Sequence, residues 1–96
     1  MQALTPDQVA HRLATLSGGW REEKGQIQRT FQFKDFVASM AFVGKVAAYA
    51  ERVQHHPDIL IRYNRVTLSV NTHDAGPGGG LTEKDFALAD AANGMA

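Results

Sequence analysis

The sequence predicts an α+β fold, a two-layer sandwich in which three helices pack on one face of a four-stranded antiparallel sheet. Three observations predict it. Helix start and stop signals frame three segments, alternating apolar and polar residues mark strands between them, and the strands come in pairs joined by short turns. Paired strands favour antiparallel hydrogen bonding, and amphipathic helices bury their apolar stripes against one face of such a sheet. The expected order is α-β-β-α-β-β-α.

The composition fits a small domain with one core. The chain has 96 residues, of which 44% are hydrophobic, and we expect a single domain over residues 1–96. Its ten basic and ten acidic side chains cancel, which argues against a nucleic-acid partner or an anionic membrane surface. No apolar run approaches the ~20 residues of a membrane span, and the first residues lack a signal-peptide pattern. The absence of cysteine excludes disulfides and suits a cytoplasmic location.

The first helix is expected to begin after Thr5. Thr5 can cap it, Pro6 fits the first turn, and Gln8 can close a capping box with Thr5. Apolar residues then recur at helical spacing until the glycine pair at 18–19 stops the helix.

A hairpin is predicted over residues 20–33, with its turn near Lys24 and Gly25. Residues 26–33, QIQRTFQF, alternate between polar and apolar side chains, which is typical of a half-buried strand. The apolar face of this strand carries Ile27, Phe31 and Phe33.

The longest helix is predicted to start after Asp35, a natural N-cap, and to end before Pro57. Its expected core stripe recurs in steps of four and three residues. The stripe consists of Phe36, Met40, Val43, Ala47 and Ala50. The sequence ERVQHH, residues 51–56, is predicted to form the last helical turn.

A second strand pair is predicted over residues 59–61 and 66–72, and it places His73 at a strand end on the polar face. A glycine-rich loop over residues 74–80 follows. It lacks the Lys-Ser/Thr of a phosphate-binding loop, so we interpret it as flexible. Thr82 can cap a last helix that buries Phe86 and Ala89 and stops at residues 93–94.

The adjacent His55 and His56 are candidate acid-base residues. A helix C-terminus favours the imidazolium form, and Glu51, four residues earlier, is expected on the same side as His55. Such rings could donate protons near neutral pH. The alternative is a C-terminal charge complement without chemistry. A metal site is a further alternative, although neighbouring helical residues point about 100° apart and chelate poorly.

His73 adds a third ring if its strand end meets the end of the long helix. Alone, it could equally be a solvated strand-end histidine. Asp85 occupies the third position after Thr82, so a capping-box role competes with a functional one. His11 fits a solvated helix residue.

These motifs together resemble the signature of the pterin-4a-carbinolamine dehydratases, also called 4a-hydroxytetrahydrobiopterin dehydratases. The resemblance covers nearly the whole chain in order and largely in spacing. The matching segments are Gly19-Trp20, Phe33 to Phe36, Glu51 to Pro57, Tyr63 to Val66, Thr72-His73 and Leu81 to Asp85. The segment Asp74 to Gly80 departs from the family pattern because it is longer, and the last helix is expected to be short.

The resemblance implies a hydro-lyase that removes water from 4a-hydroxytetrahydropterin and gives quinonoid dihydropterin for tetrahydropterin recycling. It implies that His55 and His73 donate protons to the leaving hydroxyl. His56 would bind the pterin and assist at N5, while Glu51 and Asp85 orient histidines or contact the ligand. No metal or other cofactor is implied, because the nitrogen lone pair of the substrate expels the hydroxyl.

The resemblance also implies a homodimer or homotetramer that joins helices or sheet edges. A non-catalytic protein-interaction module on the same fold is the alternative function. A metal-binding protein is a third hypothesis.

Overall fold

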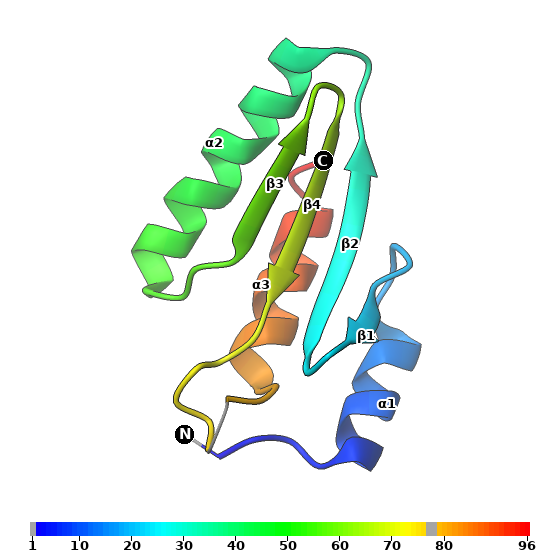
Figure 1. Ribbon diagram of the computed structural model, residues 1–96, viewed down its shortest axis with the longest axis vertical. Coiled ribbons are helices and arrows are strands. Elements are labelled where there is room, and N and C mark those ends of the chain that lie inside the picture. Colours follow the sequence, from blue (N-terminus) through cyan, green and yellow to red (C-terminus); the bar gives the residue numbers. More distant parts are fainter. Residues whose placement is uncertain (1, 77–78) are drawn as a thin grey trace.

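The computed structural model describes residues 2–76 and 79–96. Three helices and one four-stranded antiparallel sheet follow in the predicted order α-β-β-α-β-β-α (Figure 1), and the predicted α+β fold class is confirmed. The elements are α1 (Pro6–Thr15), β1 (Arg21–Glu23), β2 (Gln26–Gln32), α2 (Phe36–Val53), β3 (Asp58–Arg62), β4 (Arg65–Val70) and α3 (Glu83–Asn93). No helix within the described residues is long and apolar enough to span a membrane.

The two predicted capping boxes are both present. Thr5 Oγ1 accepts from the Gln8 amide, and the Gln8 side chain accepts from the Thr5 amide at 2.8 Å. Thr82 and Asp85 form the same arrangement at the start of α3. Each box satisfies amide groups that a helix N-terminus leaves without partners, which fixes where α1 and α3 begin.

The sheet consists of two hairpins that meet at its centre. Strand order is β1-β2-β4-β3, and β2 pairs with β4 so that Ile27 faces Val70 and Phe31 faces Val66. The first hairpin turns at Lys24 and Gly25, as predicted, with both residues at positive φ. The second hairpin turns after Arg62. Both predicted strand pairs are therefore confirmed.

The core lies between one face of the sheet and all three helices. The inward apolar side chains of β2 and β4 are almost fully buried, and the opposite face is polar, with a 2.8 Å contact between the Thr30 and Thr67 hydroxyls. The buried cluster includes Val9, Trp20, Ile27, Phe31, Phe42, Val46, Val66, Leu68, Val70, Leu81, Phe86 and Ala89. Hydrophobic burial on one side only explains the two-layer form.

The predicted core stripe of α2 is wrong at most of its positions. The buried residues are Ser39, Phe42, Val46 and Ala50, whereas Phe36 and Met40 are 48% and 40% exposed. Ala47 is exposed as well. The helix is apolar around most of its circumference, so periodicity alone did not identify its inner row. The Phe42 ring decides the orientation, since its centroid lies 4.6 Å from that of Phe31.

Candidate active site

The C-terminus of α2 sets the direction of both adjacent histidines. The helix ends at Val53, and Gln54 adopts the left-handed conformation with φ 55°. The His55 amide donates to the Ala50 carbonyl at 3.0 Å, which closes the helix end. His55 and His56 therefore lie beyond the helix, and the prediction that they form its last turn is wrong. A non-glycine residue at positive φ carries little signal in a sequence.

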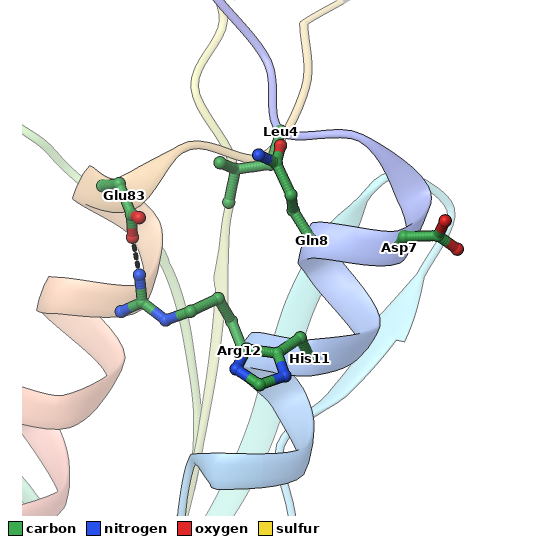
Figure 2. A pocket seen from close by; sticks show the side chains of 6 residues that line it. All are labelled: Leu4, Asp7, Gln8, His11, Arg12 and Glu83. Atoms are coloured by element: carbon green, nitrogen blue, oxygen red, sulfur yellow. Dashed lines mark ion pairs between the residues drawn. The ribbon is translucent and has the colours of Figure 1, made fainter.

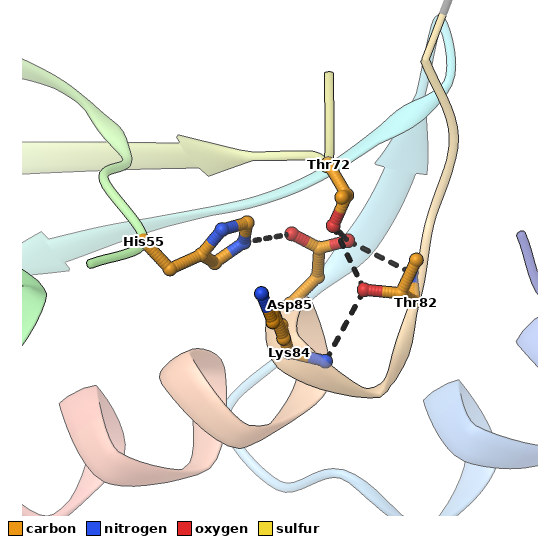
Figure 3. A network of polar contacts seen from close by, with 5 residues as sticks. All are labelled: His55, Thr72, Thr82, Lys84 and Asp85. Carbon is orange, nitrogen blue, oxygen red and sulfur yellow. Dashed lines mark hydrogen bonds and ion pairs between the residues drawn. The ribbon is translucent and has the colours of Figure 1, made fainter. Parts of the chain in front are cut away.

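The ring of His55 binds Asp85 from the first turn of α3 (Figure 3). Nε2 of His55 lies 2.6 Å from Oδ1 of Asp85, although 30 residues separate them in the chain. The Asp85 side chain is fully buried, and that of His55 is 11% exposed. Two donors hold the other carboxylate oxygen. The Thr82 amide lies 2.8 Å from Oδ2, and the Thr72 hydroxyl lies 2.9 Å from it.

Asp85 therefore makes two kinds of contact, one that stabilises the helix start and one that reaches His55. One oxygen closes the capping box of α3, and the other faces His55. The Asp85 side chain has no exposed surface.

The second histidine has an exposed partner. Nε2 of His56 lies 2.5 Å from Oε2 of Glu51, and the two side chains are 53% and 73% exposed. The expectation that Glu51 accompanies His55 is thus wrong. Because the helix ends before residue 55, the His55 ring turns toward α3 and the next ring faces Glu51.

All three predicted histidines line one cavity of about 280 Å³. His55 and His56 reach it from the end of α2, and His73 reaches it from the segment after β4. The lining is Gln54, His55, His56, Asn71, Thr72, His73, Asp74 and Lys84. Glu51 and Asp85 contact the histidines without lining the cavity. The convergence predicted for the three rings is present, and their chemical roles stay predictions.

Several lining residues were not singled out from the sequence. Thr72 is 3% exposed and continues the inward alternation of Val66, Leu68 and Val70, so the period of two did contain a signal for its burial. Asn71 lies next to it and Lys84 precedes Asp85. Of the predicted loop at 74–80, Pro77 and Gly78 lie outside the described residues.

A second hollow of about 270 Å³ lies between α1 and the start of α3 (Figure 2). Its lining includes His11, which is exposed as expected for a solvated helix residue. An ion pair joins Arg12 and Glu83 across it. One histidine lines this hollow beside the Arg12–Glu83 ion pair, whereas three histidines line the other cavity.

Metal ligation was one alternative for the histidines. Within residues 2–76 and 79–96, no three His, Cys, Asp or Glu side chains are grouped so as to hold a metal ion. The nearest partner of each of two rings is a carboxylate, which is a hydrogen-bonding arrangement.

The chain resembles known proteins over nearly its full length. Residues 2–95 match the family model described as pterin 4 alpha carbinolamine dehydratase. A protein of Acidobacterium capsulatum, provisionally named pterin-4-alpha-carbinolamine dehydratase, is 55% identical over 93% of this chain and 92% of its own. A protein of Chloroflexus aurantiacus with the same provisional name is 53% identical over 95% and 94%.

Two solved structures share the fold. A transcriptional coactivator/pterin dehydratase from Brucella melitensis superposes with a TM-score of 0.91 at 35% identity, covering 99% of both chains. A pterin dehydratase-like protein described as a RuBisCO assembly factor of the alpha-carboxysome gives a TM-score of 0.65 at 21% identity, over 83% of this chain and 89% of that one. The latter likeness concerns the fold alone. On the family match and the close relatives, this chain belongs to the pterin 4 alpha carbinolamine dehydratase family.

Proposed function

We propose that this protein is a 4a-hydroxytetrahydropterin dehydratase, a carbon-oxygen lyase that uses histidine acid-base catalysis. The observation that carries the proposal is the single cavity lined by His55, His56 and His73. Its volume of about 280 Å³ is near the lower end of small-ligand sites, roughly 300 to 1,000 Å³. Family membership supports a pterin as the ligand.

The reaction needs one proton donor and one acceptor. The C4a–O bond breaks as the hydroxyl takes a proton and leaves as water. The N5 lone pair forms the C4a=N5 bond, and N5 then loses its own proton to a base. Atoms and charges balance without an oxidant or a metal, and acid-base groups typically contribute about 10² to 10⁴ in rate. The product is quinonoid dihydropterin, which suits a role in tetrahydropterin recycling.

His55 and His73 are the proposed donors to the hydroxyl, and His56 is the proposed pterin-binding residue that assists at N5. Asp85 already accepts two hydrogen bonds at Oδ2, so its other oxygen is an acceptor toward His55. Nε2 of His55 then carries hydrogen, and Nδ1 is the atom that can exchange a proton with substrate. Glu51 would orient His56 in the same manner from an exposed position.

The exposed apolar side chains of α2 support a homodimer or homotetramer. Phe36, Val37 and Met40 are 48%, 75% and 40% exposed, and they lie close together along the first turns of one helix. Large exposed apolar groups that cluster are typical of a surface covered in an assembly. A second copy of this chain is the proposed occupant, and a cytoplasmic location stays a prediction.

Dehydration of synthetic 4a-hydroxytetrahydropterin by the purified protein tests the catalytic proposal. We expect a rate well above that of buffer. A folded variant in which both His55 and His73 are replaced by alanine should fall to the buffer rate. A wild-type rate equal to the buffer rate would contradict the proposal.

A non-catalytic interaction module is the second candidate, and the same apolar α2 surface favours it. It predicts that a variant lacking all three cavity histidines retains the biological effect of the protein. Loss of that effect together with dehydratase activity would exclude the module.

A further inference from the structure

Thr72 is a buried threonine at the edge of the histidine cavity. Its side chain is among the buried polar groups at 3% exposure, and its hydroxyl contacts two other buried groups. Oγ1 lies 2.9 Å from Oδ2 of Asp85 and 2.8 Å from Oγ1 of Thr82. Thr72 directly precedes His73 in the sequence. Its hydroxyl contacts Asp85, which is also the hydrogen-bond partner of His55 (Figure 3).

The hydrogen bonds in this cluster have one consistent direction. A carboxylate only accepts, so the Thr72 hydroxyl donates to Asp85. Its single hydrogen is then used, and the Thr82 hydroxyl must donate to Thr72. Thr82 Oγ1 in turn accepts from the Lys84 amide at 3.3 Å. The hydrogen bonds thus run from Lys84 through Thr82 and Thr72 to Oδ2 of Asp85, and Oδ1 remains as the acceptor for the His55 ring.

The backbone holds Thr72 firmly in place. Its amide donates to the Gly80 carbonyl at 2.8 Å, and the Gly80 amide donates back to the Thr72 carbonyl at 3.0 Å. The adjacent residues of α3 are fixed by the capping box. The hydroxyl is therefore presented from a fixed backbone, as a group that orients a neighbouring site residue requires.

We propose that Thr72 is a positioning residue for the acid-base site. Its hydroxyl, ordered by Thr82, holds the Asp85 carboxylate so that Oδ1 accepts from His55 Nε2 and the ring presents Nδ1 to the cavity. This inference rests on the proposed function for its catalytic consequence. The proposed orientation of the His55 ring, in contrast, does not depend on any reaction.

Thr72→Val and Thr72→Ser separate the hydroxyl from the rest of the side chain. Valine keeps the shape and removes the donor, whereas serine keeps the donor. Thr67→Val is the matched control, because it removes a hydroxyl from the Thr30–Thr67 contact on the polar sheet face, away from the cavity. The first measurement is the downfield proton NMR signal of the His55 ring N–H in the free protein, assigned with His55→Gln. The second is steady-state dehydration.

We expect Thr72→Val to lose or broaden the ring N–H signal and to lower kcat about tenfold, the size of one charge-assisted hydrogen bond, with little change in KM. Thr72→Ser should restore both readouts, and Thr67→Val should match wild type. If Thr72→Val fails to fold, Thr82→Val replaces it and should weaken the same signal.

The two readouts distinguish the two proposals. In one outcome the wild-type protein has no dehydratase activity, while the ring N–H signal is lost in Thr72→Val and kept in Thr72→Ser. This outcome would overturn the proposed function and support the positioning role. An active wild type whose ring signal and kcat both survive in Thr72→Val would overturn the positioning role alone. A wild type without an observable ring N–H signal would also overturn it.

Discussion

The imidazole of His55 and the carboxylate of Asp85 meet 2.6 Å apart, and the carboxylate has no exposed surface. A buried carboxylate is costly unless it is fully hydrogen-bonded. Here three donors, from His55, Thr72 and Thr82, share its two oxygens. The pair therefore couples the start of α3 to the end of α2, and it links the stability of the domain to the geometry of the cavity.

Replacing Asp85 by asparagine should impair both stability and turnover. If the amide nitrogen faces the Thr82 amide and the Thr72 hydroxyl, that contact loses its acceptor; if it faces the His55 ring, Nε2 must become the acceptor and the tautomer of the ring reverses. We expect a loss of about 1–3 kcal/mol in the free energy of unfolding and a marked fall in kcat. Urea unfolding and steady-state rates measure the two effects.

Asp35→Asn is the matched control for that substitution. Asp35 caps α2 and accepts from the Ala38 amide at 2.8 Å, and asparagine caps nearly as well as aspartate. An Asp85→Asn variant as stable and active as Asp35→Asn would contradict the prediction.

His55→Ala and His73→Ala should each retain part of the activity. The two rings line the same cavity from different segments, and a single loss leaves the other donor in place. The double variant should fall to the uncatalysed rate, because the two residues supply the same kind of proton. Initial rates with circular dichroism as the folding control test this, and near wild-type turnover in the double variant would refute it.

Glu51→Gln should have a small effect on stability. Glu51 and His56 are both largely exposed, and an exposed pair contributes no more than about 1 kcal/mol. We expect its effect on kcat to be smaller than that of Asp85→Asn. Steady-state kinetics of the two variants provide the comparison. A loss of kcat in Glu51→Gln that equals or exceeds that in Asp85→Asn would contradict the prediction.

Asn93→Ala should destabilise the fold without altering the chemistry of the cavity. Oδ1 of Asn93 accepts from the Trp20 indole at 2.9 Å and from the Arg29 guanidinium at 2.5 Å. Partial burial lowers the pKa of Arg29, so its solvation depends on such partners. The loss should be about 1–3 kcal/mol. Trp20 is the only tryptophan, so its fluorescence reports unfolding directly. An unchanged urea midpoint would count against this prediction.

Met40→Lys should weaken assembly of the protein. The substitution places a charge on the exposed apolar surface of α2, where a second copy would have to desolvate it. Sedimentation velocity should show a smaller species than wild type. Leu60→Lys, at an exposed apolar position on the edge strand β3, tests whether association uses the sheet edge instead. Unchanged sedimentation of Met40→Lys would exclude α2 as the contact.

Local rules predicted most of the fold. The capping residues Thr5, Asp35 and Thr82 marked the three helix starts, and alternation marked the buried face of β2 and β4. The inner row of α2 could not be predicted, because apolar residues surround that helix and the aromatic contact of Phe42 with Phe31 is a tertiary one.

The three histidines that line the cavity were candidates from the sequence, and their contacts were predicted less well. Glu51 was expected beside His55 and lies beside His56 instead, since the left-handed conformation of Gln54 redirects the chain just before His55. The burial of Asp85 likewise depends on the packing of α3 beneath the end of β4, which no local pattern encodes.

The bridge between Thr72 and Gly80 has a consequence for how this family can vary. Two reciprocal backbone hydrogen bonds join Thr72 and Gly80, and they hold the beginning and the end of the connection from β4 to α3 next to each other. Doubling the length of a closed loop costs only about 0.6 kcal/mol. We therefore expect a longer connection to cost little stability as long as His73 and Asp74, which line the cavity, keep their places, and a segment inserted after them would alter access to the cavity.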